Sequence, residues 1–143
     1  MSAERLYTPE LLGLAVELAS WPPLEGASAR GEARSSTCGS TLALDLALNP
    51  SGHIEALGMR VRACAVGQAA AALFARHALG RDRARLENDL AQLETWLTGE
   101  GPLPEWPDLA LIEAARAYPG RHGAILLPWK AATAALASAP AQA

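Results

Sequence analysis

The sequence predicts an α+β domain in which a β-hairpin is followed by helices. One observation is a run of alternating leucines from Thr41 to Asn49, which an Asn-Pro-Ser-Gly turn joins to a second extended segment from His53 to Ala63. The other is the helical spacing of apolar residues after Cys64. At 143 residues, half of them hydrophobic, the chain can form one domain with its own core, so we expect residues 1–143 to form a single domain.

The first predicted element is an amino-terminal helix. Thr8 can cap it, Pro9 suits its first position, and the apolar face consists of Leu11, Leu14, Ala15 and Leu18. The Trp21-Pro22-Pro23 sequence ends this helix. Small and polar residues dominate positions 24–36, which indicates either a loop or a weak edge strand before Cys38.

The hairpin is the clearest local signal. Leu42, Leu44, Leu46 and Leu48 repeat with period two, which indicates a half-buried strand. Asn49 to Gly52 has the residues that a type I turn favours. The apolar residues of the returning strand do not keep one phase, so we predict a β-bulge near Gly58.

Helices are predicted for most of the remaining chain. Two run over residues 65–79 and 82–98, each followed by a glycine that favours a stop. A proline-rich loop over residues 100–107 precedes a helix that Asp108 can cap and that extends to about Ala117. Pro119-Gly120 breaks this helix, a last one spans about 125–136, and residues 138–143 are expected to fray.

Composition limits the classes of function. A net charge of −3 argues against nucleic acid as a partner, because no overall cationic field attracts phosphates. No run of 18 apolar residues and no secretory signal is present, so we expect a soluble, cytoplasmic protein with no membrane partner. Between Arg60 and Arg85 there are six arginines and one acidic residue, Asp82, which indicates either a docking patch or an ordinary solvated surface.

The hairpin predicts that the two cysteines are neighbours. Cys38 precedes the first strand and Cys64 follows the second, so both lie at one end of the hairpin despite the 25 residues between them. In a reducing compartment such residues favour free thiols or metal ligands over a structural disulfide. A helix amino terminus at Cys64 would favour its thiolate, whereas burial among alanines would make the thiol inert.

Several fragments together resemble the U-type iron-sulfur cluster assembly proteins, which include IscU, SufU and the amino-terminal domain of NifU. They extend over nearly the whole chain, and their order and spacing carry the resemblance; the fragments are Leu6-Tyr7, Thr37-Cys38-Gly39, Gly52 with Ile54-Glu55, Cys64 opening an alanine-rich helix, and Gly80-Arg81. Tyr118-Pro119-Gly120-Arg121 followed by Trp129-Lys130-Ala131 is most similar to the SufU branch.

The resemblance implies a three-stranded antiparallel sheet packed against helices, with three cysteines and an aspartate that bind zinc or a nascent [2Fe-2S] cluster at one end. Cys38 and Cys64 match two of these cysteines. The aspartate is replaced by Ser40, and the third cysteine falls at Ala124, or at Gly123 in an IscU-style alignment. His122 is a candidate replacement ligand, because a neutral imidazole binds zinc or iron. The predicted metal ligands are therefore Cys38, Cys64 and His122.

The resemblance also implies a function. We expect a scaffold or accessory protein of iron-sulfur cluster assembly, not an enzyme, that binds an iron-sulfur cluster, iron or zinc or accepts sulfur. Its implied partners are a cysteine desulfurase and other iron-sulfur assembly proteins, met through Arg121 and the arginine-rich segment. The alternative is a degenerate family member that acts as an interaction module or two-thiol redox protein. A hydrolase that uses Cys38 and a histidine is weakly supported, because no orienting carboxylate is evident.

Overall fold

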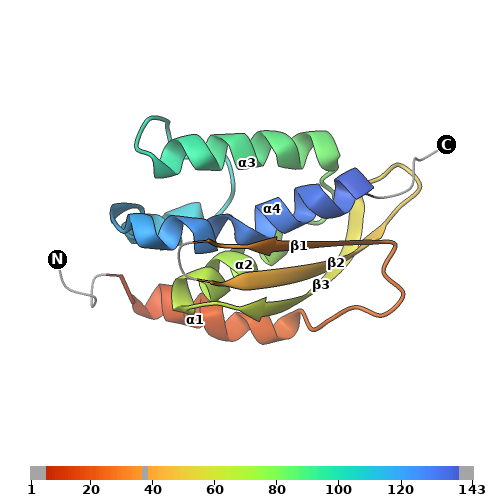
Figure 1. Ribbon diagram of the computed structural model, residues 1–143, viewed down its shortest axis with the longest axis horizontal. Coiled ribbons are helices and arrows are strands. Elements are labelled where there is room, and N and C mark those ends of the chain that lie inside the picture. Colours follow the sequence, from red (N-terminus) through yellow and green to blue (C-terminus); the bar gives the residue numbers. More distant parts are fainter. Residues whose placement is uncertain (1–5, 37–38, 139–143) are drawn as a thin grey trace.

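A computed structural model describes residues 6–36 and 39–138 of the chain (Figure 1). The chain begins with helix α1, continues through a sheet and ends with helices. In chain order the elements are α1 (Pro9–Glu17), η2 (Leu18–Ser20), β1 (Ala29–Arg34), β2 (Thr41–Leu48), β3 (Ile54–Arg62), α2 (Ala65–His77), α3 (Arg83–Leu97), η3 (Leu109–Ala117), η4 (Pro119–Arg121) and α4 (His122–Ser138). None of the helices in these described ranges is long and apolar enough to cross a membrane.

The sheet is three-stranded and antiparallel, with the order β1-β2-β3. This confirms the α+β class and shows that the weak segment before Cys38 contains an edge strand. Leu42, Leu44 and Leu46 of the central strand are at most 1% exposed, so the leucine alternation correctly identified the face that packs on the core. The opposite face carries Thr41, Ala43 and Asp45, which are only partly buried.

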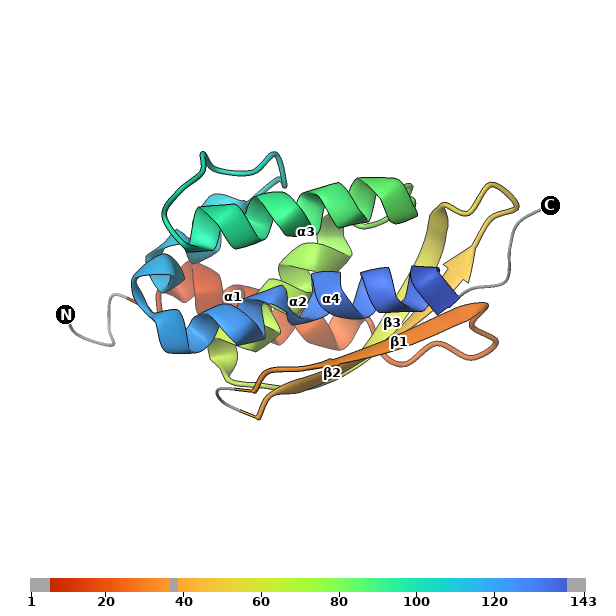
Figure 2. The same cartoon turned by 45° about the horizontal axis from the view of Figure 1, so that its top comes forward.

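Helices cover one face of the sheet in two layers (Figure 2). Helix α4 packs on β1 and β2, α2 lies between α1 and α4, and α3 packs on the far side of α4. The approach of α4 to β1 is so close that a Cβ at Gly31 would overlap the backbone of Ala131. An aromatic cluster joins the helices, with the ring of Trp129 5.4 Å from that of Phe74 and 5.1 Å from that of Trp106.

The amino-terminal helix and the turn agree with the sequence prediction. The Thr8 hydroxyl accepts a hydrogen bond from the Leu11 amide at 3.1 Å and so caps α1. In the turn, the Gly52 amide donates to the Asn49 carbonyl at 2.9 Å, and Gly52 has a φ of 84° that glycine adopts without strain.

The predicted bulge is displaced from Gly58. The register shift lies between Ala47 and Leu48, where Leu48 faces Ile54, whereas Gly58 pairs regularly with Asp45. The shift next to the turn explains why the apolar residues of β3 change phase. Gly58 is required for a different reason: the segment after α1 crosses the sheet there, and a Cβ at position 58 would overlap the carbonyl oxygen of Pro22.

Two predictions for the carboxyl-terminal part were wrong. Asp108 does not cap the segment that follows it; it has a φ of 66° and makes no capping bond, and residues 109–117 form a 3₁₀ helix instead of an α-helix. The last helix begins at His122, three residues earlier than predicted, and includes Ser138. Residues 139–143, the remainder of the predicted frayed tail, lie outside the described residues.

Candidate functional site

The strand register places the chain segments that flank the two predicted cysteine ligands at one end of the sheet. Thr41, the first residue of β2, pairs with Arg34 at the end of β1 and with Arg62 at the end of β3. This confirms that the loop before β2 and the residues after β3 share an end. Cys38 itself lies outside the described residues, so its predicted proximity to the sulfur of Cys64 stays a prediction.

Backbone hydrogen bonds close the base of the β1–β2 loop. The Ser35 amide donates to the Ser40 carbonyl at 2.8 Å, and the Gly39 amide donates to the Ser35 carbonyl at 3.0 Å. Gly39 has a φ of 69°, which a side chain would disfavour. Ser40, which replaces the aspartate implied by the resemblance, is 5% exposed. The loop base therefore has a defined shape at the site end of the sheet.

Cys64 is the N-cap residue of α2 and is a free cysteine of intermediate exposure. It packs against the edge of the core without being enclosed by it. Its side chain makes no capping hydrogen bond, and the first turn of α2 contains no acidic residue. The amide groups of that turn are therefore not neutralised by a local carboxylate. Position 64 combines a partly accessible thiol with the positive end of a helix.

Ala124 lies beside the same turn of α2. A Cβ added to Gly67 would lie 3.2 Å from the Ala124 Cβ and 2.6 Å from the Ala63 Cβ. Gly67 is one helical turn beyond Cys64, so the residue at which the resemblance placed the missing third cysteine is a neighbour of the Cys64 end of α2. Ala124 is fully buried. The position is occupied by an apolar residue that supplies no ligand atom.

His122 begins α4 and is held by the chain. Its Nε2 lies 2.8 Å from the Arg116 carbonyl oxygen; because a carbonyl oxygen only accepts, Nε2 carries the proton and Nδ1 has the free lone pair. Arg116 is itself fixed, since its guanidinium donates to the Trp96 carbonyl at 2.9 Å and lies over the Trp96 ring. A backbone carbonyl that accepts from the second imidazole nitrogen is one of the common ways in which proteins orient a metal-binding histidine.

The donor set in the described part of the chain is incomplete. Residues 6–36 and 39–138 contain no group of three histidine, cysteine or acidic residues that could together hold a metal ion. A closed zinc site has four ligands, most often thiolate or imidazole. The described residues therefore offer one thiol, Cys64, and one oriented imidazole, His122, as candidate ligands, and a four-ligand site would need Cys38 and a further ligand from outside the chain.

The opposite end of α2 is dominated by ion pairs. Arg76 contacts the Glu17 carboxylate at 2.6 and 2.7 Å and the Asp108 carboxylate at 3.3 Å, while His77 lies 2.8 Å from Asp108. The hydrogen bond from Arg76 lowers the pKa of Glu17, and the hydrogen bond with His77, supported by Arg76, lowers the pKa of Asp108. The pKa of Arg76 is raised, mainly by its hydrogen bond with Glu17. His77 and Asp108 are thus a structural pair and not isolated surface residues.

Most of the predicted arginine patch has acidic partners in the fold. Arg76 is paired as above, Arg81 bonds Asp89 at 3.0 Å, and Arg83 and Arg85 contact acidic residues one turn further along α3. Arg81 also lies 4.0 Å from the centre of the Trp106 ring.

Of the six arginines, only Arg60 and Arg62 have no acidic partner in the described part of the chain. Sequence reasoning did not identify Arg34 as a third arginine beside these two. The alternation of Arg30, Glu32 and Arg34 is a signal that they share one face of a strand, but the register that aligns Arg34 with Thr41 and Arg62 comes from the structure.

The chain is similar to known proteins in its three-dimensional structure, whereas comparisons of its sequence find no match. No protein-family model and no curated protein sequence matches the chain. The amino-terminal part of a nitrogen-fixing NifU-like protein from Brucella abortus is similar, with a TM-score of 0.85, 27% sequence identity and coverage of 94% of both chains. An iron-sulfur cluster assembly scaffold protein for the SUF system, from Fervidobacterium islandicum, has a TM-score of 0.81 at 19% identity, covering 94% of this chain and 99% of its own.

At 19% identity, the similarity to the SUF-system scaffold protein shows a shared fold and no more. The two similar structures together do not decide between the NifU and SufU branches. The proposed closeness to SufU therefore stays a prediction. Each similarity covers 94% of the chain and so includes both the sheet and the helices. In its fold, the chain is similar to these NifU-like and SUF-system proteins, and this similarity supports the resemblance to the U-type iron-sulfur scaffold family that the motif order indicates.

Proposed function

We propose that this protein is a scaffold or accessory protein of iron-sulfur cluster assembly in which Cys38 and Cys64 are the working thiols. The observation that carries the proposal is the position of Cys64, a partly exposed thiol at the amino-terminal end of α2 in a U-type fold. The two similar structures are described as NifU-like and as a SUF-system scaffold, which supports the same role here.

The chemistry of the site follows from its donor atoms. In sulfur acceptance, the Cys64 thiolate attacks the outer sulfur of a donor persulfide, the donor S–S bond breaks, and the donor thiolate leaves while Cys64 becomes the persulfide. In metal holding, the Cys64 sulfur and the Nδ1 atom of His122 are suitable donors for iron or zinc. The backbone carbonyl of Arg116 favours the required tautomer by accepting a hydrogen bond from Nε2–H.

A second candidate is a sulfur carrier or two-thiol redox protein that forms no cluster. The buried Ala124 favours it, because this residue occupies the place implied for a third thiolate and provides no donor. Ser40 is a much weaker ligand than the carboxylate implied at its position. Both candidates use the same cysteines, act stoichiometrically and not as enzymes, and require a sulfur donor such as a cysteine desulfurase in the cytoplasm.

One reconstitution experiment separates these candidates. The full-length protein is incubated without oxygen with ferrous iron, cysteine and a cysteine desulfurase, and is then examined by visible absorption and intact-mass spectrometry. A scaffold gives cluster absorption that is lost in Cys38→Ser and Cys64→Ser. A sulfur carrier gives only added sulfur mass on these residues. Arg83→Gln serves as a control on α3, and a protein that gains neither colour nor sulfur would refute the proposal.

A further inference from the structure

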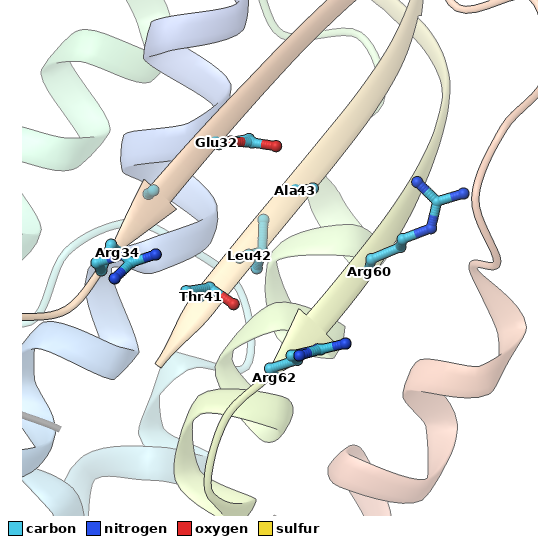
Figure 3. A pocket seen from close by; sticks show the side chains of 8 residues that line it. Glu32, Arg34, Thr41, Leu42, Ala43, Arg60 and Arg62 are labelled. Carbon is cyan, nitrogen blue, oxygen red and sulfur yellow. The ribbon is translucent and has the colours of Figure 1, made fainter. Parts of the chain in front are cut away.

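The outer face of the sheet has a groove near the Cys64 end (Figure 3). Cross-strand pairing places Arg34, Thr41 and Arg62 in one row and Glu32, Ala43 and Arg60 in the next. The groove has a volume of about 360 Å³ and is lined by these six residues together with Ala33 and Leu42. Its shape follows from side-chain size, because short residues of β2 lie between long residues of β1 and β3.

The arginines of this groove differ from the others in the fold. Arg34, Arg60 and Arg62 are exposed, and within the described residues none of them has a hydrogen bond or an ion pair. Their neighbour Arg30, by contrast, contacts Asp45 at 3.4 Å on the same face. Glu32 is the one acidic residue among the groove residues, so three positive charges face one negative charge.

We propose that this arginine groove, defined by Arg34, Arg60, Arg62, Thr41, Ala43 and Glu32, docks an acidic segment of a partner protein. The charge is locally positive in a chain whose net charge is −3, so the groove is a distinct feature of the surface. Guanidinium groups bind carboxylates through paired hydrogen bonds. A partner segment rich in aspartate or glutamate would supply carboxylates, and Arg34, Arg60 and Arg62 have no carboxylate partner within the described residues.

The width of the groove favours an extended segment over a small free anion. Arg34 and Arg62 lie on strands at either side of β2, so their backbones are about 10 Å apart at the usual strand spacing. Figure 3 shows Arg60 extending away from Thr41, so the cations do not converge on one point. Glu32 further disfavours a compact polyanion on its side of the groove and accommodates a neutral or basic residue of the partner.

The groove lies next to the proposed thiol site. Arg62 precedes Cys64 by two residues, and Thr41 follows the β1–β2 loop directly. A partner segment bound across Arg34 and Arg62 would therefore hold that partner beside Cys64. The inference goes beyond the proposed function, because docking of an acidic segment requires neither bound metal nor sulfur transfer.

The test uses a fluorescein-labelled hexaglutamate peptide and the full-length protein at low ionic strength. The groove variant carries Arg34→Gln, Arg60→Gln and Arg62→Gln. The matched control carries Arg83→Gln, Arg85→Gln and Lys130→Gln, which removes the same charge from exposed positions on α3 and α4. Fluorescence anisotropy should show about tenfold weaker binding for the groove variant and less than about twofold for the control.

A second measurement keeps the test valid if the groove variant does not fold. In the unmodified protein, the peptide should shift the amide resonances of Thr41 and Ala43 at the centre of the groove, and hexalysine should not. Equal losses in both triple variants would show general charge attraction and overturn the proposal. Displacement of the peptide by inorganic phosphate at equal total charge would identify a free-anion site and would also overturn it.

Discussion

The two ends of helix α2 differ in whether their polar and charged groups have partners within the fold. At the carboxyl-terminal end, Arg76 forms ion pairs with the carboxylates of Glu17 in α1 and Asp108 before η3, and His77 also contacts Asp108. At the amino-terminal end, the N-cap is Cys64, the first turn has no acidic residue, and the nearest arginine, Arg62, has no ion pair in the described part of the chain.

This difference indicates that the carboxyl-terminal end of α2 stabilises the fold, whereas its amino-terminal end serves function. Cations at a helix carboxyl terminus offset the helix dipole, and ion pairing adds to that effect, so the Arg76 end contributes to stability. The Cys64 end leaves amide groups, a thiol and arginines available to other molecules. The following predictions test the comparison, and they begin with the largest expected effect.

Restoring the two ligands that the family resemblance implies should strengthen zinc binding at the Cys64 end of α2. Ser40→Asp with Ala124→Cys should raise zinc affinity by more than about 100-fold, the upper range for changes to groups that only support ligands. Position 124 adjoins Gly67 in the first turn of α2, so the added thiol would lie near the Cys64 end of that helix. Competition with a chromogenic zinc chelator measures the effect.

His122→Ala is the complementary variant for that titration. If it abolishes zinc binding in the natural protein, His122 is already a ligand, and the two restoring substitutions should add little. No gain on restoration together with no loss on removing His122 would show that position 124 does not face the cysteines, contrary to the alignment with U-type proteins.

Closing the space beside Cys64 should destabilise the fold. Gly67→Ala places a Cβ 2.6 Å from that of Ala63, and we expect a loss of about 1–3 kcal/mol in the free energy of unfolding. Gly13→Ala is the matched control in α1, where a Cβ would meet nothing within 4 Å and should stabilise the helix by about 1 kcal/mol. Urea unfolding distinguishes the two, and equal changes would contradict the close packing of α2 and α4.

Arg76→Gln should have a smaller effect that depends on pH. Glu17 and Asp108 have folded pKa values below their ordinary values of 4.5 and 3.8, so they stabilise the fold above those values, and this stabilisation is lost as the pH falls through the folded pKa values. At pH 7 we expect a loss of about 1 kcal/mol or less, because the groups are partly solvated. Below pH 4 the difference from the natural protein should shrink, and a constant difference in thermal unfolding would contradict this assignment.

Loss of both thiols should have the least effect on folding. In Cys38→Ala with Cys64→Ala, cooperative unfolding should remain, because Cys64 makes no capping hydrogen bond and the core consists of the β2 leucines and the helices. Far-ultraviolet circular dichroism during heating measures this. A collapse of the helical signal would show that the thiols are structural.

Local patterns predicted the elements that short-range chemistry determines. The alternation of Leu42 to Leu46, the Thr8 cap and the Asn49–Gly52 turn each depend on neighbouring residues, and the structure confirms them. Features that depend on contacts between distant segments were not predictable. The role of Gly58 arises from the crossing of Pro22, and the left-handed conformation of Asp108 is accompanied by its bonds to Arg76 and His77.

The candidate site was predictable only in part for the same reason. The strand register and the N-cap position of Cys64 followed from the hairpin, and the placement of Ala124 beside α2 agrees with the motif alignment. The pairing of Arg76 did not follow, because its partners Glu17 and Asp108 are far away in sequence, whereas Arg81, Arg83 and Arg85 pair with acidic residues four or eight positions further along the chain. Counting charges along the sequence therefore overestimated the number of unpaired arginines between Arg60 and Arg85. It also missed Arg34, which lies in one row with Arg62 only in the folded sheet.

The most direct test of the account is the iron, zinc and acid-labile sulfide content of protein purified without oxygen, measured together for the natural chain, Cys64→Ser and Arg76→Gln. The account predicts bound metal or sulfur in the natural chain and in Arg76→Gln, and its loss in Cys64→Ser. Equal content in all three proteins, or loss in Arg76→Gln alone, would contradict the assignment of function to the Cys64 end of α2.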